Sequence, residues 1–227
     1  MATTTTTTKG KPLSAEQVFD SIGPAYEDAF ADLKPQLASI DWLLERLQTR
    51  KPAKILDIGC GTGRPVCSRL ADAGHDVLGI DVSGTMIEDA KKKVPNARFQ
   101  KLDLGHFHPQ EESWDAVTVY FSMIASVTQD QIRQNIKDIF TWLRSGGWFV
   151  FATVPLAGNN SEINWLGRDV VVSSLGAEEA VGCIREAGFE VLFREETEFT
   201  PRAKEAGICG GERVWTEPHL FVYARKP

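Results

Sequence analysis

Short apolar runs separated by amphipathic stretches occupy the middle of the chain. The runs are five or six residues long, rich in Val, Ile or Phe, and bounded by Gly, Asp or Pro, as buried strands are. They cover Lys54–Ile58, Asp76–Asp81, Ala97–Lys101, Ala116–Phe121 and Trp148–Thr153. Helical spacing of apolar residues separates most of them, over Pro65–Ala73, Gly84–Lys93 and Asp130–Leu143. This alternation predicts a doubly wound α/β fold, a mostly parallel sheet with helices on both faces.

The last part of the chain adds one more helix and two more strands to this pattern. The helix is expected over Ala177–Ala187, and the strands over Phe189–Glu195 and His219–Arg225. Two intervening segments, residues 155–175 and 199–217, read as loops, and loops of this length are usually functional.

The N-terminal part of the chain divides into a polar tail and a helical region. Residues 1–12 contain a threonine tract and almost nothing that can be buried, which predicts a disordered tail. Residues 13–50 carry apolar positions at helical spacing with breaks at Pro24 and Pro35, which predicts two or three helices. We interpret residues 13–227 as one domain.

Composition narrows the class of partner. The 227 residues are 42% hydrophobic with a net charge of −6, and no Lys/Arg-rich stripe supports binding to nucleic acid. No segment resembles a membrane span or a secretory signal, so a cytoplasmic protein with a small-molecule partner is expected. The four cysteines show no CxxC pair and no metal-ligand spacing, so no metal site is indicated.

The stretch KILDIGCGTGRPV carries the clearest chemical signal. Gly59, Gly61 and Gly63 follow the first predicted strand, where missing side chains and free N–H groups admit a ligand close to the backbone. Asp81 ends the second strand, and its carboxylate can accept hydrogen bonds from both hydroxyls of a ribose. Asp103 follows the third strand and can accept a hydrogen bond from the exocyclic amine of a purine. Together these residues predict a bound nucleoside.

Two nucleoside cofactors share this geometry. A nicotinamide dinucleotide normally requires GxGxxG, but Arg64 stands at the third glycine position. The carboxylate of Asp57 suits a cationic amino group, bound directly or through water, and would repel a pyrophosphate. These features favour S-adenosylmethionine over a dinucleotide, although a nicotinamide-dependent oxidoreductase remains an alternative.

At this point the chain resembles the class I S-adenosylmethionine-dependent methyltransferases, and in particular the small-molecule branch that is similar to ubiquinone-biosynthesis methyltransferases. The resemblance covers about residues 14–227 and rests on four motifs in order: LDIGCGTG, LGIDVSGTMIEDAKKK, WDAVTVYFSMIASV and LRSGGWFVFATV. It implies a Rossmann-like, seven-stranded sheet whose last strand is antiparallel, with N-terminal lid helices over the cofactor. It also places residues 155–175 and 199–217 on the acceptor side.

The resemblance further implies which residues bind S-adenosylmethionine. Asp81 would contact the ribose, Asp103 the adenine amine, and Phe121 and Ser122 would lie near the methionine arm. Tyr26 stands where relatives carry a Tyr that closes over the cofactor. The full expected set is Tyr26, Asp57, Gly59, Cys60, Gly61, Asp81, Val82, Met86, Asp103, Leu104 and Phe121.

The catalytic base is less clear, because two polar positions of such relatives are absent. Ala125 and Ser174 stand where many of them carry histidine. Either the acceptor is already acidic, or the base comes from elsewhere. The candidates for a catalytic role are Tyr26, Ser122, His219 and Glu162, with Asp169 and Glu212 as further loop carboxylates.

Two functions therefore remain open. The first is methyl transfer to an O, N or C atom of a small metabolite, such as a secondary metabolite. The second is a cyclisation or rearrangement promoted by bound S-adenosylmethionine without methyl transfer. The sequence leaves the acceptor and the oligomeric state open.

Overall fold

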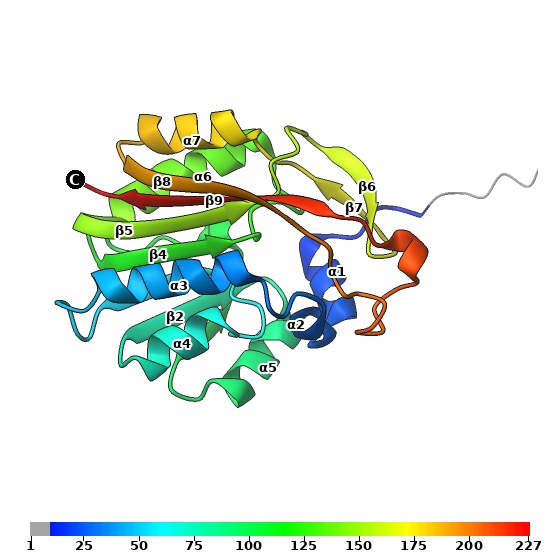
Figure 1. Ribbon diagram of the computed structural model, residues 1–227, viewed down its shortest axis with the longest axis horizontal. Helices are drawn as coiled ribbons and strands as arrows, with labels where there is room; N and C mark the ends of the chain where they lie inside the picture. The colour runs from blue at the N-terminus through cyan, green and yellow to red at the C-terminus, as the bar shows by residue number, and fades with distance from the viewer. Residues whose placement is uncertain (1–9) are drawn as a thin grey trace, which may run out of the picture.

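A seven-stranded sheet forms the centre of the molecule in the computed structural model, which describes residues 10–227 (Figure 1). Its strand order is β3-β2-β1-β4-β5-β9-β8. Strands β1 to β5 pair in parallel, and β9 runs antiparallel to both β5 and β8. The strands are β1 Lys54–Ile58, β2 Asp76–Asp81, β3 Arg98–Lys101, β4 Trp114–Tyr120, β5 Leu143–Thr153, β8 Glu190–Phe199 and β9 Glu217–Arg225. The predicted fold, including its antiparallel last strand, is confirmed; most of the predicted tail over residues 1–12 lies outside the described residues.

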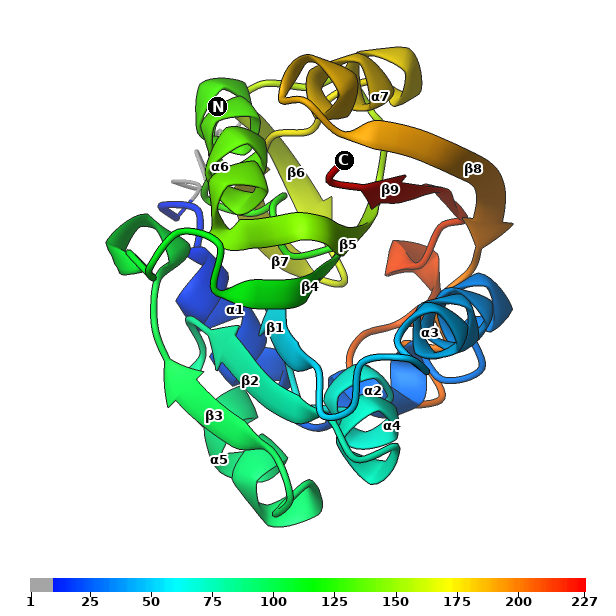
Figure 2. The same ribbon diagram turned by 90° about the vertical axis from the view of Figure 1, so that its left-hand side faces the viewer.

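Helices cover both faces of the sheet (Figure 2). One face carries α3 (Lys34–Arg46), α4 (Val66–Asp72) and α5 (Gly84–Lys93), and the other carries α6 (Gln129–Trp142) and α7 (Ala177–Glu186). A capping box begins α6, since the side chain of Thr128 accepts from the N–H of Gln131 and the side chain of Gln131 accepts from the N–H of Thr128.

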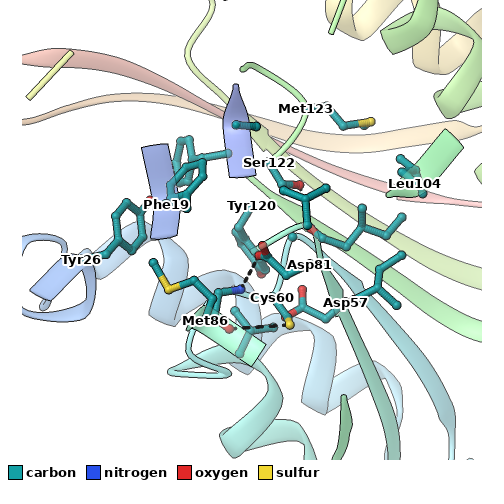
Figure 3. A pocket seen from close by; sticks show the side chains of 18 of the residues that line it. Phe19, Tyr26, Asp57, Cys60, Asp81, Met86, Leu104, Tyr120, Ser122 and Met123 are labelled. Carbon is teal, nitrogen blue, oxygen red and sulfur yellow. Dashed lines mark hydrogen bonds between the residues drawn. The ribbon is translucent and has the colours of Figure 1, made fainter. Parts of the chain in front are cut away.

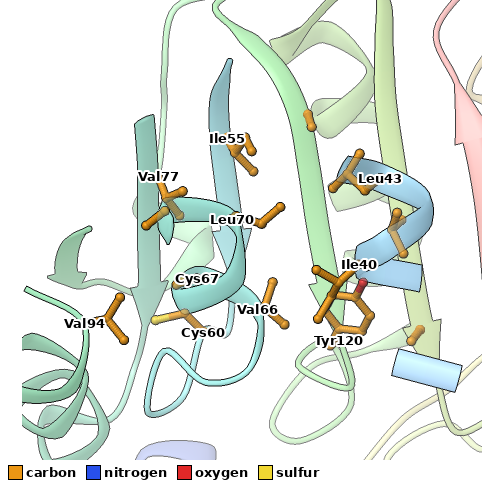
Figure 4. Close-up of a cluster of buried hydrophobic side chains, with 14 of the residues drawn as sticks. Ile40, Leu43, Ile55, Cys60, Val66, Cys67, Leu70, Val77, Val94 and Tyr120 are labelled. Atoms are coloured by element: carbon orange, nitrogen blue, oxygen red, sulfur yellow. The ribbon is translucent and has the colours of Figure 1, made fainter. Parts of the chain in front are cut away.

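The two faces have separate hydrophobic cores, and β1 contributes to both. Ile55 packs with Leu43 of α3 and Leu70 of α4 on one side (Figure 4), whereas its neighbour Leu56 packs on the side of α6 and α7. Both side chains are fully buried. A parallel strand buried on both faces is apolar at consecutive positions, which explains the unbroken run of the sequence. This packing fixes the end of β1, where the glycine turn begins.

Two short helices, α1 (Ala15–Ile22) and α2 (Ala25–Ala29), lie over the carboxyl ends of the parallel strands (Figure 1). We call them the lid helices. Ser14 caps α1, and Gly23, with a φ of 58°, makes the turn between them. The region predicted as lid, residues 13–50, is therefore divided, because α3 packs on β5 and β9.

The segment 155–175, predicted as a loop, contains a β-hairpin. Strands β6 (Ser161–Trp165) and β7 (Arg168–Val172) pair antiparallel around Leu166 and Gly167. Both turn residues have positive φ, 47° and 82°, as a two-residue hairpin requires. Leucine is uncommon at such a position, so the turn gave no sequence signal. The segment 199–217 begins with the last residue of β8 and ends with the first of β9; between them, residues 200–216 are irregular except for one 3₁₀ turn, Gly211–Arg213.

Within residues 10–227, no helix has the length and apolar character needed to cross a membrane.

Candidate functional site

A cavity of about 680 Å³ lies between the lid helices and the carboxyl ends of β1, β2 and β4 (Figure 3). We call it the donor cavity. Every residue expected to bind the cofactor lines it, and so does Ser122. The structure therefore brings the predicted set together, while the individual contacts with a cofactor stay predictions. The set is Tyr26, Asp57, Gly59, Cys60, Gly61, Asp81, Val82, Met86, Asp103, Leu104 and Phe121.

The glycine turn after β1 has two kinds of glycine. Gly59 has a φ of 70°, and a Cβ there would lie 2.0 Å from the Cβ of Ser122. Gly61 has a φ of 53°, but a Cβ there would meet nothing within 4 Å. Gly59 thus lets the turn after β4, at Ser122, pack against the glycine turn, whereas Gly61 leaves open space in the cavity wall. That space is where a ligand can approach the backbone.

Asp81, at the end of β2, is fixed by the turn it faces. Its Oδ2 accepts a hydrogen bond from the N–H of Gly61 (2.9 Å), and its Oδ1 accepts one from the N–H of Ser83 (2.8 Å). Burial raises the pKa of Asp81. Because each carboxylate oxygen has two lone pairs, both oxygens can still accept a hydroxyl from the cavity. This arrangement suits the two adjacent hydroxyls of a ribose.

Asp57, in β1, is a buried carboxylate with polar neighbours on both oxygens. Its Oδ1 accepts from the hydroxyl of Thr118 (2.6 Å) and its Oδ2 from the thiol of Cys67 (3.2 Å). Burial raises the pKa of Asp57 to about 6, against the lowering effect of these two hydrogen bonds. A cation bound in the cavity would favour the ionised form. The site therefore fits an ammonium group at this end.

The opposite end of the cavity suits a purine. Asp103 is exposed, and its Oδ1 accepts from the N–H of Gly105 (2.9 Å), which leaves Oδ2 for a ligand. Leu104 and Val82 are half-buried and Met86 is buried, and these apolar side chains line the same cavity as Asp103. Apolar walls together with one free carboxylate oxygen suit an adenine and its amine.

A second cavity, of about 180 Å³, adjoins the first. We call it the apolar cavity. It is enclosed by α1, the β6–β7 hairpin and the loop after β5, and its walls are mostly aliphatic and aromatic. Trp165 and Trp215, from the two segments predicted as loops, both line it. Among the described residues that line it, Glu217 is the one carboxylate. The residues common to both cavities are Phe19, Tyr26, Phe30, Phe121 and Ala125.

Phe121 marks the junction of the two cavities. It follows β4 with a φ of 56°, a left-handed conformation that costs a bulky residue about 1–3 kcal/mol. The turn is held by the N–H of Phe121, which donates to the carbonyl of Ala152 (2.9 Å). Such strain, maintained by the surrounding structure, directs the ring between the two spaces.

The catalytic candidates are distributed unequally around these cavities. Tyr26 lines both. Ser122 lines the donor cavity, but its hydroxyl donates to the carbonyl of Ile58 (2.7 Å), which gives it a role in the turn. His219 is 1% exposed and lines neither cavity; its Nε2 lies 3.4 Å from Oε2 of Glu217. Glu162 is exposed on β6 and lines neither cavity.

The further loop carboxylates, Asp169 and Glu212, also lie outside both cavities. Glu217 was not among the sequence candidates. The available signal was its spacing of two from His219, which places both side chains on one face of a strand.

These features define a Rossmann-like protein with a nucleoside-binding cavity whose charges suit an aminoacyl nucleoside. Comparison with known proteins agrees. Residues 55–147 match the family model described as "Methyltransferase domain". Methyltransferase GfsG of Streptomyces halstedii is 28% identical over 127 residues, which are 53% of this chain and 45% of that protein. Demethylmenaquinone methyltransferase of Paenarthrobacter aurescens is 27% identical over 157 residues, 66% of this chain and 60% of that protein. The chain thus spans about half the length of the curated relatives it matches.

Solved structures show the same fold. An S-adenosylmethionine-dependent methyltransferase from Mesorhizobium loti superposes with a TM-score of 0.61 at 20% identity, covering 86% of this chain and 99% of that chain. The [4+2]-cyclase SpnF superposes with a TM-score of 0.68 at 18% identity, covering 96% of this chain and 98% of that chain. Residues 55–147 therefore match a methyltransferase domain, and the chain shares its fold with S-adenosylmethionine-dependent methyltransferases; the predicted cofactor is the one that these relatives imply.

Proposed function

We propose that this chain transfers the methyl group of S-adenosylmethionine to an O, N or C atom of a small metabolite with an apolar body. The supporting observation is the meeting of the two cavities at Tyr26, Phe121 and Ala125. One cavity has the carboxylates that suit the donor, and the other is apolar and suits an acceptor. When bound, S-adenosylmethionine supplies an electrophilic methyl group attached to a sulfonium that becomes a neutral thioether on transfer.

The donor cavity would hold the cofactor by three carboxylates in sequence. Asp57 would face the ammonium, Asp81 the ribose hydroxyls and Asp103 the adenine amine. This assignment rests on the hydrogen-bond capacity that each side chain retains beyond its partners within the protein.

The chain's own contribution to rate would be positioning and exclusion of water. Three carboxylates attach the lid helices to the sheet domain, and one of them, Glu16 of α1, accepts from Lys101 of β3 (2.6 Å). Asp20 of α1 accepts from the hydroxyl of Ser83 (2.6 Å), and Glu27 of α2 accepts from Thr62 (2.9 Å) and Lys93 (2.7 Å). A closed lid holds two reactants at contact distance and removes solvent, which can supply much of the acceleration of a methyl transfer.

A single substituted ring is the acceptor group that best fits the apolar cavity, and the relative that methylates demethylmenaquinone agrees with a ring-containing acceptor. We extend this to a quinol-like or secondary-metabolite acceptor. The test uses deuterated-methyl S-adenosylmethionine with a panel of quinols, phenols and aromatic amines. We expect a deuterated-methyl product and an equal amount of S-adenosylhomocysteine, measured by mass spectrometry.

Asp103→Asn provides the residue-level test of the donor cavity. It keeps an oxygen for the N–H of Gly105 but removes the second carboxylate oxygen, so the affinity for S-adenosylmethionine should fall about tenfold. Asp28→Asn, at an exposed position on α2, is the matched control and should bind normally. Normal binding by Asp103→Asn would contradict the assignment of the purine end.

The alternative is a cyclisation or rearrangement guided by the bound cofactor. It is favoured by the largely apolar walls of the second cavity and by Ala125 at a position where histidine was expected. Product formation without S-adenosylhomocysteine would select this alternative and reject methyl transfer.

A further inference from the structure

Glu217, at the start of β9, is an unusual residue for the wall of an apolar cavity. Glu217 is 6% exposed, and the other side chains that line the apolar cavity are aliphatic, aromatic or small and polar. A carboxylate removed from water costs free energy unless its oxygens accept hydrogen bonds. The contacts of Glu217 therefore indicate what the cavity can bind.

Two side chains hold this carboxylate in place. The indole Nε1–H of Trp165, on the β6–β7 hairpin, donates to Oε1 (2.7 Å). Nε2 of His219 lies 3.4 Å from Oε2, a weak contact. The imidazole is itself fixed between Phe121 and Phe199, at centroid distances of 4.4 and 5.8 Å. Trp165 and His219 thus fix the orientation of Glu217 and leave lone pairs on both oxygens unused.

The surroundings of Glu217 link it to the donor cavity. Tyr26 lines both cavities, and its pKa is raised first by burial and then by the negative charges of Glu217 and Asp81. Glu217 and Asp81 therefore both lie close enough to Tyr26 to influence it, and its phenol stays protonated. A ligand in the apolar cavity meets Glu217 while it lies beside the donor cavity.

We propose that Glu217 accepts a hydrogen bond from the hydroxyl or N–H of the acceptor and removes its proton during methyl transfer, with Trp165 and His219 as positioning residues. This inference rests on the proposed function. The acceptor oxygen or nitrogen forms the new bond to the methyl carbon while the carbon–sulfur bond breaks and its electron pair stays on sulfur. The acceptor proton passes to the Glu217 carboxylate and from there to solvent.

The size of the apolar cavity limits the acceptor group. A dry cavity of about 150 Å³ binds benzene, and this cavity is about 180 Å³. It therefore has room for one six-membered ring with a small substituent, and Glu217 requires that the substituent be a donor. The class of acceptor group is a phenol, an enol or an aromatic amine.

A binding test compares 4-methylphenol with toluene, which differ by one hydroxyl. Both are titrated by calorimetry into the full chain saturated with S-adenosylhomocysteine. We expect 4-methylphenol to bind about tenfold more tightly, the effect of one hydrogen bond to a charged group. Glu217→Gln should reduce this ratio to about threefold or less and leave toluene binding unchanged, which shows an intact cavity.

Glu198→Gln is the matched control, because Glu198 is exposed on β8 opposite Pro218. It should keep the tenfold ratio. Equal binding of the two compounds by the wild-type chain, absence of binding by both, or an unchanged ratio in Glu217→Gln overturns the proposal.

A second measurement separates this inference from the proposed function. Methyl transfer from labelled S-adenosylmethionine to 4-methylphenol should fall about a hundredfold in Glu217→Gln, with cofactor affinity unchanged. Equal transfer by both chains overturns the role of Glu217 and leaves the proposed function intact. If no acceptor is methylated but Glu217→Gln loses the preference for 4-methylphenol, the proposed function fails while the acceptor-binding role of Glu217 is supported.

Discussion

At the scale of single residues, the glycines of the turn after β1 serve two different purposes. Gly59 gives space to the β4 turn, and Gly61 gives space to a ligand. Gly59→Ala should lower the free energy of unfolding by more than about 3 kcal/mol, because its Cβ would overlap Ser122. Gly61→Ala should lower the free energy of unfolding by only about 1–2 kcal/mol, the cost of a left-handed backbone at alanine. It should nevertheless weaken S-adenosylhomocysteine binding at least tenfold. Chemical denaturation and calorimetry measure the two effects.

Gly74→Ala is the matched control for the backbone cost. Gly74 has a φ of 88°, a Cβ there would meet nothing within 4 Å, and the residue lines neither cavity. Its variant should lose about as much stability as Gly61→Ala and bind S-adenosylhomocysteine normally. Equal affinity of the two variants would mean that Gly61 does not face the ligand.

Asp57 predicts a dependence of cofactor affinity on pH. Its folded pKa of about 6 lies above the ordinary value of 3.8, so between these values the ligand-free folded chain retains a proton that the unfolded chain has lost. Ionisation of Asp57 therefore opposes folding as pH rises through this range. An ammonium ligand needs the ionised form, so it must displace that proton below about pH 6. Affinity for S-adenosylhomocysteine should fall up to tenfold for each pH unit below that point.

Calorimetry between pH 5 and 7 measures how steeply this affinity depends on pH. Asp57→Asn should remove the part of the pH dependence that comes from protonation of Asp57. Any part that comes from Asp81, whose pKa burial also raises, should persist in the variant. A slope that is the same in both chains would show that Asp57 does not contact the ammonium.

The residues of the donor cavity could be predicted from the sequence, and Glu217 could not, for a physical reason. Asp57 is the last residue but one of β1, Asp81 ends β2 and Asp103 follows β3, so local pattern places all three near one edge of the sheet. Glu217 becomes part of a site only because the hairpin brings Trp165 to it from 52 positions away. Such a contact depends on tertiary packing that no local pattern records.

At the scale of elements, the lid depends on a few polar contacts. Asp20 accepts from Ser83 and from the N–H of Thr85 (3.1 Å), and these bonds join α1 to the start of α5. Asp20→Ala should speed amide exchange across Ala15–Ile22 about tenfold and lower global stability by only about 1 kcal/mol. Asp28→Ala, on the exposed side of α2, should leave exchange unchanged. Unchanged exchange in Asp20→Ala would mean that the other contacts of α1, among them the ion pair of Glu16 with Lys101 and the apolar contacts of Val18 and Ile22, hold it without Asp20.

The extent of the elements was less predictable than their existence. β4 begins at Trp114 and β5 at Leu143, earlier than the apolar pattern indicated, and these two residues pair across an irregularity in the ladder. Arg144, Ser145 and Gly146 are part of β5, but Gly146 has a φ of 76°, so the chain bends within this strand. The Ser-Gly-Gly turn signal of the sequence is thus expressed as an irregularity inside β5, between the pairs of Leu143 and Trp148, and not as the boundary of the strand.

At the scale of the whole molecule, the fold follows from the order of strands and helices. Consecutive apolar residues such as Ile55 and Leu56 require cover on both faces, and the intervening helices are long enough to provide it. That argument is independent of any single contact, which is why the sheet could be predicted from the sequence. The acceptor side could not, because it is built from a hairpin with an atypical turn and an irregular segment.

Ligand binding should stabilise the entire domain, because the donor cavity joins the lid helices to three strands of the sheet. S-adenosylhomocysteine at a hundred times its dissociation constant should add about 2.7 kcal/mol to the free energy of unfolding. For a chain of this size, that corresponds to a rise in melting temperature of about 5–10 °C. NAD should give no rise, because Arg64 replaces the third glycine of a dinucleotide turn and Asp57 would repel the pyrophosphate. Differential scanning fluorimetry with the two ligands decides between them, and stabilisation by NAD alone would reject the donor cavity as an S-adenosylmethionine site.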